Sequence, residues 1–330
     1  MSELTDAQRQ VLTAVCDTVV PAIAREPDPD GFFARRASDV GVPQVLETTL
    51  AEMPDDQRGG FLQLLDAVEE QGLVRSSQRS REQILRNVAL MGQDAAAGVG
   101  ALTSLTLYFH YGLPDEHGHN PSWATFGYPG PVSAPPPDDK PLRPLVPDDD
   151  TVLEADVCVV GSGAGGGVMA GELSERGLKV VVLEAGGYFD DADFNQLEIP
   201  AYMNTYWRGG PTPTGDLNVS LQAGFCLGGG TTINWTNSLR TTPWVREQWE
   251  RDFGLEGLAG AEFDRHLDAV WERLVVNDRC SELNAPQRRM QAGAEHLGWS
   301  FARTNRNIDE DRYDFGTAGF IGFGDQSGAK

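Results

Sequence analysis

The stretch that decides the fold reads Asp156-Val-Cys-Val-Val-Gly-Ser-Gly-Ala-Gly-Gly166, an apolar strand that runs into a glycine-rich turn. A helical segment follows as far as Arg176, and a second apolar strand, Val180–Leu183, ends at Glu184. Two short β-branched runs separated by a helix are typical of a parallel β–α–β unit. The stretch therefore predicts an α/β fold in this part of the chain.

The glycines of this turn match a dinucleotide fingerprint, because Gly161, Gly163 and Gly166 have the spacing GxGxxG. In such units they allow a tight turn, a close approach to a pyrophosphate, and close packing of helix on strand. The helix N-terminus offers free N–H groups to the phosphates. Glu184 follows Gly161 by 23 residues, close to the roughly 20 expected for the carboxylate that binds an adenosine ribose. We predict that these residues and Ser162 bind a dinucleotide; the alternative is a glycine-rich surface turn.

Charge and cysteine content argue against several other classes of protein. The 330 residues include 49 Asp and Glu but only 26 Lys and Arg, a formal charge of −23. Such a field repels nucleic acid phosphates and anionic membrane surfaces. The four cysteines form no CxxC pair, so we predict neither a disulfide framework nor a metal site. The first residues contain no secretory signal, and we expect a cytoplasmic protein.

The N-terminal region, residues 1–127, has the periodicity of helices. Thr5 and Gln8 form a capping box, and apolar residues then recur at helical spacing until Pro21. Three further helices are expected at 43–53, 61–68 and 81–91. Residues 128–152 are rich in proline and acidic side chains and predict an extended linker. Beyond Gly187 a polar loop is expected as far as Asn218, and the sequence leaves open whether it covers a ligand.

A second glycine cluster reads Leu227-Gly-Gly-Gly-Thr-Thr-Ile-Asn-Trp235. Consecutive glycines expose backbone N–H groups and allow the close approach of a flat or anionic ligand. Thr231 and Asn234 add short polar side chains beside them. Polar groups mixed with aromatic residues suit a pocket for a large cofactor. Taken alone, the cluster is more typical of a glycine-rich turn.

Taken together, the fingerprint, Leu183-Glu-Ala-Gly-Gly187 and Gly228–Trp235 resemble the glucose–methanol–choline (GMC) family of FAD-dependent oxidoreductases. The chain is most similar to the branch of long-chain fatty alcohol oxidases. Three further segments carry the resemblance, at 15–21, 120–129 and 237–243.

This resemblance implies that the dinucleotide is FAD. Gly161, Ser162, Gly163 and Gly166 would then contact the pyrophosphate, and Glu184 the adenosine ribose. The second glycine cluster would lie near the pyrophosphate and the flavin through Gly229, Gly230, Thr231 and Asn234. A nicotinamide dehydrogenase is the competing interpretation, but it needs no second glycine cluster for its cofactor.

The resemblance also implies a domain plan. A Rossmann-like FAD-binding domain at residues 153–260, with an incomplete parallel sheet, would follow the all-α region, and residues 261–330 would begin a substrate domain. The family oxidises the CH–OH group of primary alcohols by hydride transfer to flavin N5, and oxygen or another acceptor reoxidises the flavin. Membrane association is left open.

No catalytic residue is assigned in this sequence. In the family a histidine near the end of a longer chain acts as the base, paired with a second His or an Asn. The five histidines here are expected to be surface or packing residues. We therefore expect the N-terminal portion of an oxidoreductase that is inactive by itself. The alternative is a flavin-binding subunit or fragment with no catalysis of its own.

Overall fold

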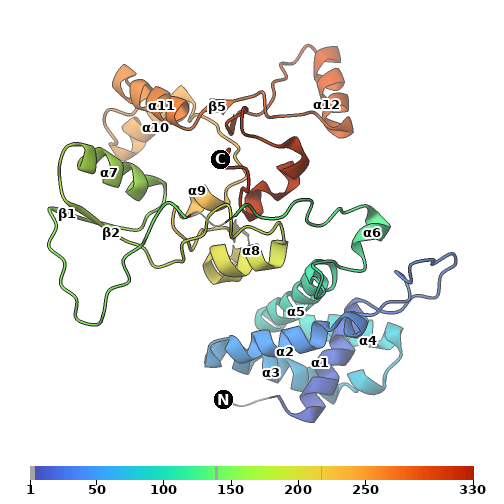
Figure 1. Cartoon of the computed structure of the whole chain (residues 1–330). Helices are drawn as coiled ribbons and strands as arrows, with labels where there is room; N and C mark the ends of the chain where they lie inside the picture. Colours follow the sequence, from blue (N-terminus) through green and yellow to red (C-terminus); the bar gives the residue numbers. More distant parts are fainter. Residues whose placement is uncertain (1–3, 138–139, 217) are drawn as a thin grey trace. The chain divides into compact units, whose positions relative to one another are not determined.

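The computed structural model describes residues 4–137, 140–216 and 218–330. The chain divides into two compact units, Met1–Gly130 and Pro131–Lys330 (Figure 1). Residues 138 and 139 of the predicted linker and residue 217 of the predicted loop lie outside the described part.

The first unit is built from helices. They are α1 (Asp6–Val19), η1 (Ala37–Val40), α2 (Val42–Glu52), α3 (Asp55–Glu70), η2 (Leu73–Arg75), α4 (Gln78–Ala89), α5 (Gln93–Gly112) and α6 (Trp123–Phe126). The capping box predicted at Thr5 is confirmed, since its hydroxyl accepts a hydrogen bond from Gln8 N at 3.2 Å. Ser77 caps α4, which therefore begins three residues before the predicted start at Arg81.

The core of this unit surrounds α1, which contacts α2, α3, α4 and α5. Its fully buried side chains come from successive turns of the helices and include Val11, Leu12, Leu46, Leu50, Leu65 and Val68. Each such burial stabilises the unit by roughly 1.5–3 kcal/mol. Within the described ranges, no helix combines the length and the apolar character that a membrane crossing requires.

The second unit mixes helices with short strands. Its first part comprises β1 (Val157–Val160), α7 (Ala164–Glu175), β2 (Val180–Leu183), α8 (Glu198–Thr205), η3 (Trp207–Gly209), β3 (Thr212–Pro213) and β4 (Ser220–Leu221). The remainder comprises α9 (Gly230–Ile233), α10 (Pro243–Phe253), α11 (Ala261–Arg273), β5 (Val276–Asn277), α12 (Ala285–His296), β6 (Arg306–Asn307) and η4 (Phe315–Phe323).

The predicted β–α–β unit is confirmed. Strands β1 and β2 are parallel, with Val157 opposite Val180 and Val160 opposite Leu183, and α7 connects them. The predicted loop after Gly187 is partly wrong, because Glu198–Thr205 form the helix α8. Pro200 lies in the first turn of this helix, where a missing N–H costs no hydrogen bond.

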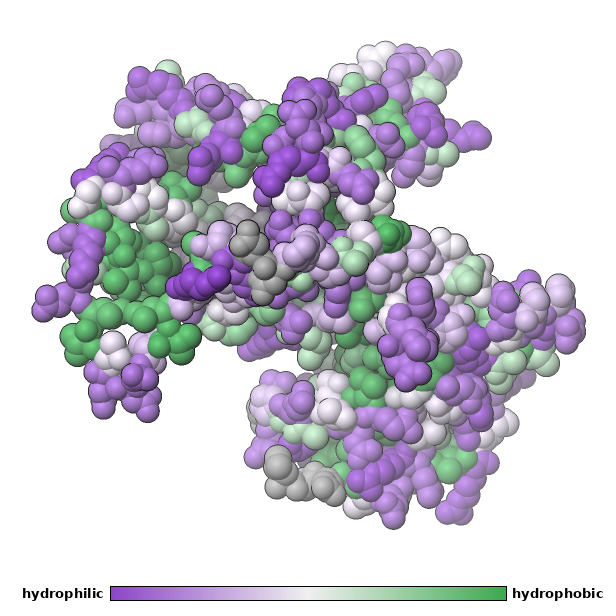
Figure 2. All heavy atoms as spheres, in the orientation of Figure 1, coloured by the Kyte–Doolittle hydropathy of each residue, from purple (hydrophilic) through white to green (hydrophobic). Residues whose placement is uncertain are grey.

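Apolar side chains remain exposed around this two-stranded sheet. Val160 is 83% exposed, Leu183 51% and, on α7, Val168 57%. Figure 2 shows apolar residues gathered over β1 and β2. Parallel sheets are normally covered on both faces, and two strands alone are marginally stable in water. Within the described residues, the apolar side chains of β1, β2 and α7 therefore remain partly uncovered.

Candidate cofactor site

The first glycine turn lies at the carboxyl end of β1. Gly161 N donates to Leu183 O at 2.8 Å, which ties the turn to β2. Helix α7 begins directly after Gly163. A Cβ added at Gly166 would stand 1.9 Å from the Gly161 carbonyl oxygen, so the helix can pack this closely on the turn only with glycine there.

The carboxylate of Glu184 is held against this turn. Its Oε2 accepts hydrogen bonds from Ser162 N at 2.9 Å and from Ser162 Oγ, and its Oε1 accepts from Gly186 N at 2.8 Å. Partial burial raises the pKa of Glu184, but the bonds from Ser162 and Gly186 outweigh burial and leave it below its ordinary value. The ionised carboxylate therefore helps to fix the glycine turn, and it loses this effect as the pH falls through the lowered pKa.

The structure brings the second glycine cluster against the first. Gly228 N donates to Ser162 Oγ at 3.0 Å, and Leu227 N donates to Gly187 O at 2.8 Å. Gly229 has a φ of +53°, and a Cβ there would lie 3.0 Å from the Gly163 Cα. Two segments that are far apart in the sequence thus form one glycine-lined wall.

The polar residues of the second cluster shape its short helix, α9. Thr231 Oγ1 donates to Gly228 O, Asn234 Nδ2 donates to Thr231 O at 3.1 Å, and Asn234 Oδ1 accepts from Thr236 N at 2.8 Å. Both side chains therefore stabilise the turn at Gly230, and any direct contact of theirs with a cofactor stays a prediction.

The residues of this wall fit a dinucleotide. The first N–H groups of α7 have no partner within the helix, and they stand at its positive dipole end. A Cβ at Gly163, Gly165 or Gly230 would meet no atom within 4 Å apart from its chain neighbours and the backbone of its own helix. This arrangement of open backbone and free N–H groups can hold a pyrophosphate, whose negative charge it would stabilise.

Lys330 is a site residue that the sequence did not indicate. Its partly buried Nζ donates to Thr232 O at 2.6 Å, Asn234 O at 2.7 Å and Ile321 O at 3.1 Å. The lysine thereby fastens the end of α9 to η4. Burial lowers the pKa of Lys330 to about 8, against the opposing effects of Asp325 and Cys226. No local pattern reveals such a contact, since the lysine lies 98 residues from Thr232.

This lowered pKa predicts a measurable dependence of stability on pH. Between the folded pKa, about 8, and the ordinary 10.5, the unfolded chain binds a proton that the folded chain has released, so stability rises with pH. We expect the unfolding free energy of the wild type, minus that of Lys330→Met, to increase by about 2 kcal/mol from about pH 7 to about pH 10. Urea denaturation measures it, and a pH-independent difference would contradict the assignment.

None of the described residues that form the glycine wall is a histidine. His110, His117 and His119 belong to the helical unit, where burial lowers the pKa of His110. His266 and His296 are exposed on α11 and α12.

The segment that contains both glycine clusters matches a known protein family. The model of the family described as GMC oxidoreductase matches residues 159–330. A long-chain-alcohol oxidase of Arabidopsis thaliana, FAO4B, is 38% identical over 178 residues, 54% of this chain and 23% of the relative. No solved structure matches the chain significantly.

Two further relatives match more of the chain. Long-chain-alcohol oxidase FAO1 of Arabidopsis thaliana is 27% identical over 72% of this chain and 35% of its own length. An uncharacterized GMC-type oxidoreductase of Mycobacterium tuberculosis is 31% identical over 71% of this chain and 37% of its own length. The chain thus spans between about a quarter and just over a third of these relatives. Since the family model covers more than half of its residues, the chain belongs to the GMC oxidoreductase family.

Proposed function

We propose that this chain is the cofactor-binding part of an FAD-dependent oxidoreductase that acts on the CH–OH group of long-chain primary alcohols. The observation that carries the proposal is the contact of the two glycine clusters, through Gly228 N with Ser162 Oγ and through Gly229 with Gly163. The names of the Arabidopsis relatives support the substrate class.

In this proposal, bound FAD supplies the acceptor for the hydride of the alcohol. The N–H groups of the first turn of α7 hold the pyrophosphate, together with Gly161, Ser162, Gly163 and Gly166. Glu184 holds the turn and takes the adenosine ribose. Gly229, Gly230, Thr231 and Asn234 line the neighbouring wall, and Lys330 positions that wall through its three carbonyl partners.

The proton of the alcohol needs a base at hydrogen-bond distance, and we propose that polypeptide outside residues 1–330 supplies it. The same polypeptide would cover the exposed apolar side chains of β1 and β2. Oxygen or another acceptor would then reoxidise the cofactor. The second candidate is a flavin-binding subunit or fragment that has no catalysis of its own.

Anaerobic reduction tests this proposal. The purified chain is loaded with FAD, and the visible absorption of the flavin is followed after 1-decanol is added. We expect bound flavin whose absorption the alcohol leaves unchanged, whereas dithionite bleaches it as the control. Bleaching by 1-decanol would show that residues 1–330 contain the base. A chain that binds NAD and no FAD would refute the cofactor.

A further inference from the structure

The helical unit contains an open cavity whose lining shares no residue with the proposed cofactor site. It lies between α3, the end of α4 and the first half of α5, with a volume of about 660 Å³. Pockets for small ligands have volumes of roughly 300–1,000 Å³. The space exists because small residues face it from α3 and α5, namely Gly60, Ala67, Ala95, Ala97, Gly98 and Ala101.

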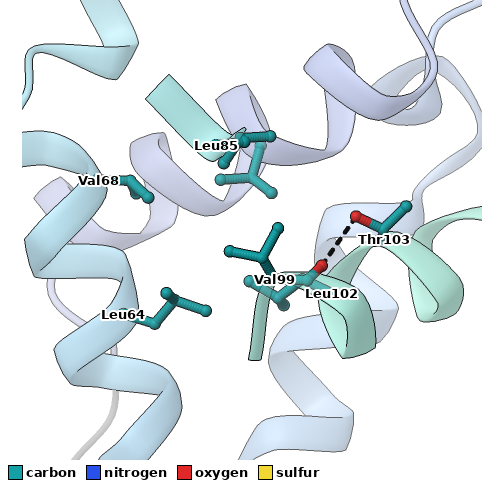
Figure 3. A pocket seen from close by; sticks show the side chains of 7 residues that line it. Leu64, Val68, Leu85, Val99, Leu102 and Thr103 are labelled. Atoms are coloured by element: carbon teal, nitrogen blue, oxygen red, sulfur yellow. Dashed lines mark hydrogen bonds between the residues drawn. The ribbon is translucent and has the colours of Figure 1, made fainter. Parts of the chain in front are cut away.

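The floor of this cavity is apolar and closed. A Cβ at Gly98 would meet Leu64 Cδ2 at 2.9 Å, so α3 and α5 approach each other closely there. Leu64 also lines a small packing gap deeper in the unit, where the side chains of Val68, Leu85 and Leu102 converge (Figure 3). The hydroxyl of Thr103 is satisfied there, since Oγ1 donates to Val99 O at 2.8 Å. The floor therefore suits an apolar occupant.

The polar and charged groups at this cavity favour a neutral head group. The polar side chains that line it are Gln57, Gln63 and Asp94, all exposed. Among the described lining residues none is cationic. A fatty acid or a phospholipid would place its negative charge near the Asp94 carboxylate with no compensating cation, which is unfavourable. An uncharged hydroxyl can hydrogen-bond to the glutamine side chains instead.

We propose that this cavity binds the unbranched aliphatic chain of a neutral long-chain alcohol. We infer an aliphatic chain from the apolar residues that line the cavity. The choice of an alcohol rests on the proposed function. The match to FAO1 covers 72% of the chain, more than the 200 residues from Pro131 to Lys330, so it extends into the helical unit. An alcohol site in this unit is thus compatible with the name of this relative, a long-chain-alcohol oxidase.

Methyl NMR of the full chain without added FAD tests this site. Met91 lines the cavity, whereas Met290 lies on α12 in the other unit; the Met91 signal is assigned with Met91→Leu. We expect 1-decanol to shift the Met91 methyl signal saturably and to leave Met290 unchanged. Decanoate is expected to bind more weakly than 1-decanol because of the Asp94 carboxylate, and 1-butanol to give no saturable shift.

Paired variants locate the binding. Gly60 lines the cavity and Gly59 does not, and a Cβ at either meets nothing within 4 Å. Gly60→Leu is expected to weaken 1-decanol binding at least about 10-fold by filling the space, and Gly59→Leu to leave it unchanged. Ala101→Trp, with the exposed Ala96→Trp as its control, repeats the comparison on α5 if a glycine variant fails to fold.

Three results would overturn the proposal. They are an unshifted Met91 signal at saturating 1-decanol, equal binding by Gly60→Leu and the wild type, and a Met91 signal that depends on protein concentration without alcohol. The last would show that a second copy of the chain occupies the cavity. Because no FAD is present, each of these results leaves the cofactor proposal untouched.

Discussion

Replacing Gly166 with alanine is expected to lower the affinity of the chain for FAD at least about 100-fold, or by about 2.7 kcal/mol. The new Cβ would stand 1.9 Å from the Gly161 carbonyl oxygen and 3.0 Å from the Gly161 carbonyl carbon. Both are backbone atoms, so α7 must move away from the turn. The N–H groups at its start would then no longer point at the proposed pyrophosphate site.

The matched control is Gly171→Ala, in the same helix. A Cβ at Gly171 meets nothing within 4 Å, and alanine stabilises a helix by up to about 1 kcal/mol relative to glycine. Titration with FAD, followed by quenching of flavin fluorescence, measures both variants. If Gly166→Ala bound FAD as tightly as Gly171→Ala, the fingerprint turn would not be the pyrophosphate site.

Replacing Gly224 with alanine is the second large effect that we expect. Its Cβ would lie 2.2 Å from the Gly229 carbonyl carbon and 2.8 Å from Gly230 N, so the second glycine cluster must leave its present position beside Gly163. Overpacking of this kind costs about 1–3 kcal/mol. We expect FAD affinity to fall at least about 10-fold, together with a lower Tm.

Gly215→Ala serves as the control for this change, because a Cβ at Gly215 meets nothing within 4 Å. The double variant Gly166→Ala/Gly224→Ala adds a sharper test. Changes in one shared site are non-additive, whereas changes in independent sites add. If both glycine clusters form one cradle, the double variant loses less affinity than the sum of the two single losses. If the two losses of FAD affinity were additive, the two clusters would act as independent sites and not as one cradle.

Local features of this fold could be predicted from the sequence, because neighbouring residues determine them. The capping box at Thr5 and the β–α–β unit around Gly161 depend on residues within one or two adjacent elements. The residues of helix α8 were predicted to form a loop, because a proline in polar surroundings is typical of a turn. Pro200 instead lies in the first turn of the helix, where a proline is tolerated.

Contacts between residues far apart in the chain could not be predicted from the sequence. Ser162 and Gly228 lie 66 residues apart, and only the family resemblance suggested that their glycine clusters share a ligand. No sequence pattern indicated that Lys330 joins α9 to η4, because its partners are backbone carbonyls that any residue could provide. The cavity in the helical unit was also unpredicted, since alanines and glycines on facing helices are as typical of close packing as of open space.

Equilibrium dialysis of the wild-type chain against FAD and, separately, against NAD tests the central claim most directly. The two glycine clusters form one wall with an open backbone around Gly163 and Gly230. We predict that FAD binds with one molecule per chain and that NAD does not bind. Binding of NAD in preference to FAD, or of neither dinucleotide, would contradict the account.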